Sequence, residues 1–165
     1  MSERHARIEI RPATIDDAAD VHRLIRELAR TTGLSDKFRS TADDYREYGF
    51  GSNPMFEALV AVLDDDIVGV ALYFYTFSSW RGEPGVYLQD LVVTEAARGR
   101  RLGERLMRRL VRVAKERDAT HLRLAVDCNN IDAMRFYERV GMSNVESDFI
   151  YEIEGDDFVQ LGIKS

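Results

Sequence analysis

Arginine and glycine residues gather between positions 98 and 103, where the sequence reads RGRRLG directly after an apolar stretch. Glycines at Gly99 and Gly103 let a ligand approach the backbone without a Cβ in the way. If this loop opens a helix, the first backbone N–H groups of that helix lack internal partners and favour an anion. The spacing therefore predicts a phosphate cradle, and the alternative is a solvated basic helix start with a turn glycine.

The flanking patterns supply the elements that such a cradle needs. A buried strand is indicated by the apolar, β-branched content of residues 91–93, and apolar residues follow at helical spacing: Leu102, Leu106, Leu110 and Val113. Neither Gly-x-Gly-x-x-Gly nor Gly-x-x-x-x-Gly-Lys-Ser/Thr occurs in this neighbourhood, which excludes the dinucleotide and P-loop classes. We expect strand, loop and helix in that order, with the anion at the helix N-terminus.

The rest of the chain predicts an alternation of strands and helices. Helices are expected between Thr14 and Gly33, where Thr14 and Asp17 have the spacing of a cap, and again at residues 41–48, 130–140 and 156–161. Strands are expected at residues 8–10, 58–63, 67–77, 86–93, 121–127, 143–146 and 149–153.

Length and composition limit the class of protein. The chain has 165 residues, 45% of them hydrophobic, so we expect one globular domain over residues 1–165 with no transmembrane helix and no membrane partner. The N-terminus shows no secretory signal, and Cys128 is the single cysteine, so we expect no internal disulfide and a cytoplasmic location. The net charge of −6 argues against nucleic acid as a partner and is compatible with a cationic small molecule.

Two segments resemble motifs of one enzyme family. Residues 98–103 look like the Arg/Gln-x-x-Gly-x-Gly/Ala signature with which the GNAT superfamily of N-acetyltransferases binds acetyl-coenzyme A (acetyl-CoA). Residues 130–141, NIDAMRFYERVG, resemble the Asn-x-x-Ala-x-x-Phe-Tyr-x-x-x-Gly segment of the same superfamily. The resemblance implies an α/β (α+β) fold, with a mixed, largely antiparallel sheet flanked by helices on both faces and splayed where acetyl-CoA enters.

A closer resemblance within that superfamily runs over nearly the whole chain. YFYTFSSWRG at residues 73–82, YLQDL at residues 87–91 and the ending at residues 154–161 look like the spermidine/spermine and thialysine acetyltransferase group. The likeness implies transfer of an acetyl group to the primary amine of a small molecule, either a polyamine or an amino-acid-like compound. It also implies a homodimer, because those relatives are dimeric.

The resemblance also implies which residues contact acetyl-CoA. The pyrophosphate would lie on residues 99–104, the backbone N–H groups of Leu91 and Val93 would meet the pantetheine arm and the acetyl carbonyl, and Asn130 would hold that arm. Arg101 stands where the signature usually has its first glycine, and a side chain pointing outward would accommodate the difference. The full candidate set is Leu91, Val92, Val93, Arg98, Gly99, Arg100, Arg101, Leu102, Gly103, Glu104, Asn130 and Ala133.

Acetyl transfer to an amine needs a base for the amine and a proton for the leaving thiolate. By resemblance, Tyr137 is the acid that protonates the departing sulfur. The relatives carry a Glu base where this chain has Gln89, and an amide accepts no proton usefully at neutral pH. Three alternatives stay open: Asp90 acts, an ordered water acts, or the amine arrives neutral. In an unbroken strand Gln89 and Asp90 face opposite sides, so Asp90 needs a bulge or a water to reach the site.

Three further residues are candidates for contact with the acceptor. Trp80 and Tyr87 offer aromatic rings to a cationic amine, unless they are ordinary packing residues, and Glu27 offers a carboxylate at the substrate mouth. Cys128 invites an acyl-enzyme mechanism, but no histidine lies close to it in sequence, which favours a small buried residue. No metal site is expected, because none of the histidines has ligand spacing: His5, His22 and His121.

Together these features predict an acetyl-CoA-dependent N-acetyltransferase that acts on a small amine by direct transfer. The enzyme alternative is a protein N-acetyltransferase. The alternative from another class is an acetyl-CoA-binding module that has lost catalysis, and it is motivated by Gln89 and Arg101.

Overall fold

The computed structural model describes residues 7–145 and 150–163 of the chain. Its contacts divide it into two compact units, residues 1–125 and residues 126–165, and each unit is described by itself. The single domain expected over residues 1–165 stays a prediction from the sequence.

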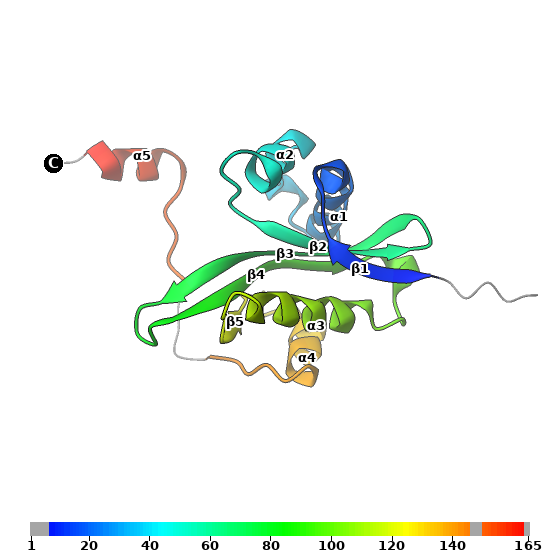
Figure 1. The fold of residues 1–165 in the computed structure, drawn as a ribbon. Helices are drawn as coiled ribbons and strands as arrows, with labels where there is room; N and C mark the ends of the chain where they lie inside the picture. Colours follow the sequence, from blue (N-terminus) through cyan, green and yellow to red (C-terminus); the bar gives the residue numbers. More distant parts are fainter. Residues whose placement is uncertain (1–6, 146–149, 164–165) are drawn as a thin grey trace, which may run out of the picture. The chain divides into compact units, whose positions relative to one another are not determined.

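A five-stranded sheet with the strand order β1-β2-β3-β4-β5 forms the centre of the first unit (Figure 1). Its strands are β1 (Ile8–Pro12), β2 (Glu57–Leu63), β3 (Asp66–Ser78), β4 (Glu83–Val93) and β5 (His121–Arg123). Neighbouring strands are antiparallel from β1 to β4, whereas β5 runs parallel to β4. The mixed, largely antiparallel sheet expected from the sequence is confirmed.

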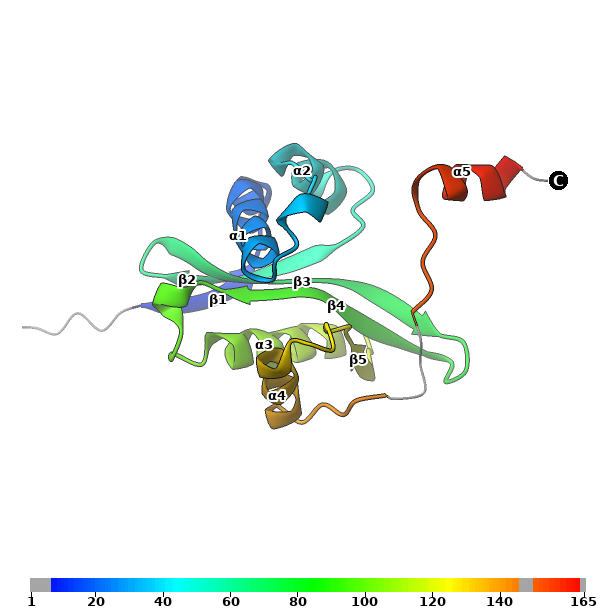
Figure 2. The same cartoon turned by 180° about the vertical axis from the view of Figure 1, so that it is seen from behind.

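Helices cover both faces of this sheet. Helices α1 (Ala18–Thr31) and α2 (Ala42–Phe50) lie on one face, and α3 (Leu102–Lys115) lies on the other (Figures 1 and 2). At the start of α2, the Thr41 hydroxyl accepts the Asp44 N–H at 3.3 Å, while the Asp44 carboxylate accepts the Thr41 N–H at 2.6 Å. This reciprocal cap satisfies N–H groups that have no helical partner, which is why α2 begins there.

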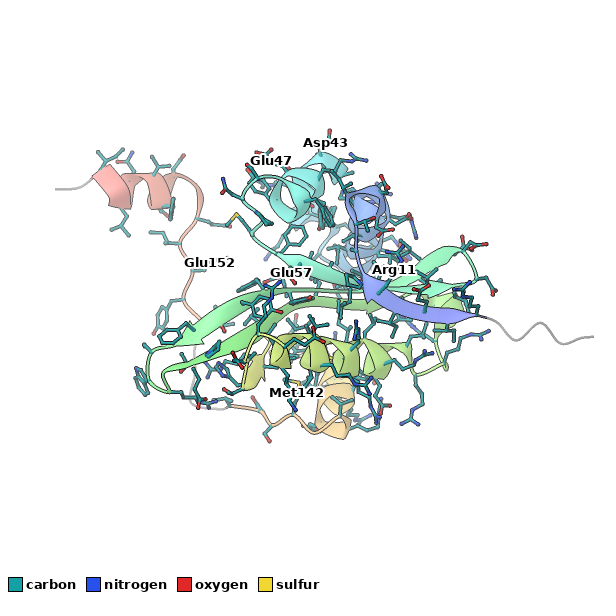
Figure 3. All side chains as sticks on the ribbon, viewed as in Figure 1. Arg11, Asp43, Glu47, Glu57, Met142 and Glu152 are labelled. Atoms are coloured by element: carbon teal, nitrogen blue, oxygen red, sulfur yellow. The ribbon has the colours of Figure 1, made fainter. Side chains whose placement is uncertain are left out.

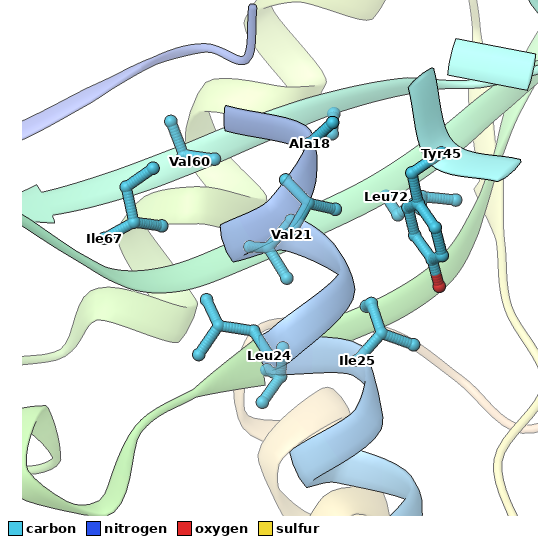
Figure 4. Close-up of a cluster of buried hydrophobic side chains, with 11 residues drawn as sticks. Ala18, Val21, Leu24, Ile25, Tyr45, Val60, Ile67 and Leu72 are labelled. Atoms are coloured by element: carbon cyan, nitrogen blue, oxygen red, sulfur yellow. The ribbon is translucent and has the colours of Figure 1, made fainter. Parts of the chain in front are cut away.

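The two faces of the sheet belong to two different apolar layers. Under α1 and α2 the buried cluster consists of Ala18, Val21, Leu24, Ile25, Tyr45, Ala58, Val60, Ile67, Val70, Leu72 and Val92 (Figure 4). On the opposite side α3 buries Leu102, Leu106, Met107, Leu110 and Ala114. Full burial of a leucine-sized side chain contributes about 1.5–3 kcal/mol, so both layers fix which strand residues face which helix.

One extra residue interrupts the regular alternation along β4. Leu88 lies opposite Tyr73 and Asp90 lies opposite Leu72, so Gln89 has no partner on β3. In an unbroken strand Leu88 and Asp90 would share a face, but this β-bulge turns Asp90 toward α1 and α2 and Leu88 toward α3.

Charged side chains gather outside these layers (Figure 3). Asp43 and Glu47 project from α2 into solvent, whereas Arg11 at the end of β1 holds the carboxylate of Asp17 through two hydrogen bonds of 2.6 and 3.0 Å. Asp17 is only 7% exposed and precedes α1 directly. Hydrogen bonds from Arg11 hold the pKa of Asp17 below its usual range. The Arg11–Asp17 ion pair therefore links β1 to the start of α1.

The second unit holds α4 (Ile131–Arg139) and α5 (Gly155–Ile163), where the sequence predicts helices. Three predicted strands come out differently. The strand predicted for residues 121–127 ends at Arg123, because its pairing with β4 stops there, and the Asp127 carboxylate accepts the Asn129 N–H at 2.8 Å in a local turn further along the chain. In the two segments near the C-terminus, residues 143–145 and 150–153 form no strand, so those predictions are wrong there, while residues 146 and 149 lie outside the described ranges.

The last of those segments has strand-like residue types without strand-like burial. Ile150 is 82% exposed and Tyr151 is 94% exposed. A strand is stabilised by ladder hydrogen bonds and by packing of one face, and residue types alone supply neither.

Candidate functional site

The edge of β4 is open along the half of the strand that leads to the predicted cradle. In the part of the chain that the structure describes, β5 pairs with β4 only at Gly85–Tyr87. The Thr94 N–H donates to the Val68 carbonyl oxygen at 2.8 Å, on the β3 side. Because backbone direction alternates along a strand, Leu91 and Val93 direct their N–H and C=O groups to the unpaired side. This edge therefore offers donors and acceptors to an extended ligand.

The turn after this edge prepares the N-terminus of α3. Gly99 and Arg101 both have left-handed backbone angles, with φ of 79° and 56°. Arg101 is the N-cap residue, its side chain caps no first-turn N–H group, and the first helical bond runs from the Arg105 N–H to its carbonyl oxygen at 3.0 Å. The N–H groups of Leu102 and Gly103 precede that bond and carry the positive end of the helix dipole. The geometry suits an anion, as the sequence predicts.

Glu104 determines where two arginine side chains of this region lie. Its carboxylate accepts hydrogen bonds from Arg101 at 2.9 Å and from Arg108 at 2.5 Å. The Arg101 hydrogen bond is the largest cause that lowers the pKa of Glu104, so this carboxylate stays ionised. The Arg101 guanidinium is therefore directed along the first turn of α3, while Arg98 and Arg100 are exposed on the loop.

Gln89 and Asp90 occupy the bulge of β4 in different environments. Gln89 is exposed, whereas Asp90 is half-buried on the face that α1 and α2 cover. Burial raises the pKa of Asp90. A carboxylate with a raised pKa is a stronger base near neutral pH, so its chemistry suits proton removal from an amine. The bulge that Asp90 needs for that role is present in the strand.

Tyr45 packs on the same face of the sheet as Asp90 and was not singled out from the sequence. It lies in the same buried cluster as Leu72, the residue opposite Asp90, and Val92, which follows Asp90 on the same face. Burial raises the pKa of Tyr45, and the negative charge of Asp90 adds to that shift. The helical spacing from the Thr41 cap marks Tyr45 as a buried position, but no local pattern links it to a strand that comes later in the chain.

The candidate acceptor residues lie in separate environments. Trp80 is 99% exposed in the β3–β4 hairpin. Tyr87 stacks on Phe74 with ring centroids 5.1 Å apart. Glu27 pairs with Arg30 on α1 at 2.5 Å, and this hydrogen bond lowers the pKa of Glu27. No contact joins these three candidates in the described part of the chain.

The second unit carries the other candidates for cofactor binding and catalysis. Asn130 is the N-cap of α4, and its side-chain oxygen accepts the Ala133 N–H at 3.1 Å. Tyr137 lies on α4 with its ring 5.2 Å from that of Phe136, edge to face. Cys128 is exposed rather than buried. The motif residues of this unit thus start and line one short helix.

Residues 7–145 and 150–163 contain no group of three or more His, Cys, Asp or Glu side chains that could hold a metal ion. No helix among them has the length and the apolar character needed to cross a membrane.

Comparison with known proteins extends these observations. The sequence profile of the acetyltransferase (GNAT) family matches residues 21–142. A thialysine N-epsilon-acetyltransferase from Bos taurus is 32% identical over 168 residues, which covers 95% of this chain and 98% of the relative.

Solved structures agree with this match. An integron cassette protein from the mobile metagenome of V. cholerae superposes with a TM-score of 0.81 at 25% identity, over 95% of this chain and 98% of that one. An aminoglycoside N-acetyltransferase in complex with CoA has a TM-score of 0.71 over 94% of this chain and 100% of that one. At 15% identity the second likeness is one of fold alone.

Proposed function

The chain belongs to the acetyltransferase (GNAT) family, and from that premise we propose that it transfers the acetyl group of acetyl-CoA to the primary amine of a small, amino-acid-like molecule. The enzyme is an N-acetyltransferase, and transfer is direct, from the thioester to the amine. The observation that carries the proposal is the open edge of β4, which leads into the uncapped N-terminus of α3.

These two features fit the parts of acetyl-CoA. Residues 99–104 would take the pyrophosphate, because helix N–H groups without partners and a left-handed Gly99 let an anion approach the backbone. The N–H and C=O groups of Leu91 and Val93 would pair with the amide groups of the pantetheine arm, as a neighbouring strand would. By resemblance, Asn130 and Ala133 at the start of α4 complete the cofactor contacts.

The chemistry requires three proton transfers. Asp90 would accept the proton of the ammonium, so that the neutral amine attacks the thioester carbonyl and a C–N bond forms as the C–S bond breaks. Tyr137 would donate its proton to the departing thiolate, a role carried over from the family resemblance, and the phenolate left behind would take the second proton, which the attacking nitrogen loses as the amide forms. Gln89 would then serve as a hydrogen-bonding group and not as a base, because a side-chain amide does not usefully accept a proton at neutral pH.

The acceptor is proposed from the chemistry of the relatives and of this surface. The bovine relative is named for thialysine, and another relative, from Salmonella typhimurium, is named for aminoalkylphosphonates. Both names describe small molecules with a primary amine. The net charge of −6 favours an acceptor that arrives as a cation. We propose further that the enzyme is cytoplasmic and acts as a homodimer, with Trp80, Tyr87 and Glu27 facing the acceptor.

A two-part experiment tests this function. Calorimetry measures the binding of acetyl-CoA, and an assay for free thiol measures turnover with thialysine, spermidine and a lysine-containing peptide. We expect tight binding and the fastest turnover with thialysine. Turnover with the peptide alone would favour a protein N-acetyltransferase, and binding without turnover on any amine would favour a module that has lost catalysis.

A further inference from the structure

Tyr45 packs between two aromatic rings of the first unit. Its ring contacts His22 of α1 edge to face, with centroids 5.5 Å apart, and Phe56, which precedes β2, with centroids 5.8 Å apart. The residue is only 9% exposed. The reciprocal cap of Thr41 and Asp44 fixes the helix that carries it. A ring held from several sides has one well-defined position.

That position is over the face of β4 that carries Asp90. The buried cluster that contains Tyr45 also contains Leu72, directly opposite Asp90, and Val92, two residues further on the same face (Figure 4). The shared cluster thus brings the Tyr45 ring to the stretch of β4 that carries Asp90, and the pKa of Tyr45, raised chiefly by burial, is raised further by the negative charge of Asp90.

The exclusion of water accounts for the raised pKa of Asp90. Burial is the one cause of its raised pKa. The α1 side chains buried on this face are apolar: Ala18, Val21, Leu24 and Ile25. The ionisable neighbours of Tyr45 are His22, whose ring bonds to the Ser40 carbonyl oxygen at 2.9 Å, and Asp44 in the helix cap. Neither contributes to the pKa shift of Asp90, and its partner on β3 carries no charge.

We propose that Tyr45 is a positioning residue for Asp90: its ring covers the carboxylate, keeps bulk water away from it and so maintains it as the base for the acceptor amine. This inference rests on the proposed function, in which Asp90 takes the proton of the ammonium. Burial, and no hydrogen bond, raises the pKa of Asp90, and the proposal assigns most of that burial to the Tyr45 ring.

A titration that does not depend on turnover tests the shielding. The carboxyl carbon of Asp90 is followed by NMR in the full chain with labelled aspartate, and Asp90→Asn assigns the signal. Tyr45→Ala should lower the pKa of Asp90, because water reaches the carboxylate. Tyr45→Phe should leave it raised, because the ring remains. An unchanged titration in Tyr45→Ala, or an equal fall in Tyr45→Phe, would overturn the proposal.

Two control variants separate shielding from loss of packing. Val21→Ala removes buried volume from the same cluster on α1, so it should lower the melting temperature without moving the Asp90 titration. Tyr48→Ala removes an aromatic ring that is 46% exposed on the same helix and should change neither. If Tyr45→Ala does not fold, Tyr45→Leu takes its place, with the same direction of change expected.

The pH profile of turnover on thialysine then connects the shielding to catalysis. In Tyr45→Ala the acid limb should move to lower pH and kcat should fall about tenfold, because a less basic carboxylate is the weaker general base. A shifted titration with no turnover by the wild-type chain on any amine would reject the proposed function and leave the shielding intact. Turnover by the wild-type chain with the same acid limb in Tyr45→Ala would reject the positioning role alone.

Discussion

Arg101 has a backbone conformation that suits glycine. Its φ of 56° is left-handed, which costs a residue with a Cβ about 1–2 kcal/mol. The ion pair with Glu104 offsets little of this conformational cost, because the Arg101 side chain is 76% exposed. Arg101→Gly should therefore raise the free energy of unfolding by about 0.5–1 kcal/mol, measured by chemical denaturation. Arg100→Gly is the control, because Arg100 lies in the same loop without a positive φ, and an equal gain there would contradict the explanation.

Tyr137 has an expected role that depends on a single hydroxyl group. If it protonates the leaving thiolate, Tyr137→Phe should lower kcat by about 10²–10⁴, since a proton needed only in the transition state is lost. The affinity for acetyl-CoA should stay nearly the same by calorimetry. Tyr151→Phe is the matched control, because that ring is 94% exposed. Near-wild-type turnover of Tyr137→Phe would refute the acid role.

At the scale of elements, the N-terminus of α3 is where the cofactor proposal is most open to test. Gly103 lies in the first turn of the helix, so Gly103→Val would place a branched side chain where the pyrophosphate is expected. We expect the affinity for acetyl-CoA to fall at least tenfold, equivalent to about 1.4 kcal/mol. Arg112→Val controls for the low helix propensity of valine, because it is an exposed position of the same helix. Unchanged affinity in a folded Gly103→Val variant would remove the pyrophosphate from this turn.

Sequence patterns located the elements better than they located their ends. The apolar stripe of α1 and the cap of α2 are local signals, and both helices lie where they were predicted. The strand predicted for residues 121–127 is short because pairing with β4 stops at Arg123, and pairing depends on a distant segment. The bulge at Gln89 also depends on a distant segment, since only the register with β3 reveals it. Tyr45 was missed for the same reason, because its link to Asp90 depends on the register of the later strands β3 and β4.

At the scale of the whole molecule, the Arg11–Asp17 pair links stability to pH. The pKa of Asp17 is lowered in the folded protein, chiefly by the Arg11 hydrogen bond. Its stabilisation is therefore fully present above the ordinary aspartate pKa of about 4 and is lost as the pH falls through the lower folded value. Asp17→Asn should cost about 1–3 kcal/mol of unfolding free energy at neutral pH, and the difference from wild type should shrink in acid.

Denaturation curves at several pH values measure this effect. Asp43→Asn is the control, because the Asp43 side chain is 90% exposed and its ion pair with Arg46 lies in solvent. We expect that variant to match the wild type at every pH. A constant difference between Asp17→Asn and wild type over the acid range would show that the carboxylate charge has no part in the stability.

The bulge in β4 reverses the alternation of side chains between the two faces of the sheet. Before Gln89 the odd-numbered Tyr87 faces α1 and α2, and after it the even-numbered Asp90 and Val92 do. If one residue were deleted or inserted on one side of the bulge, the side chains of the rest of the strand would point to the opposite face of the sheet. A deletion on one side together with an insertion on the other would only shift the position of the bulge along the strand. The number of residues on each side of the bulge thus decides which face of the sheet Leu88 and Asp90 occupy.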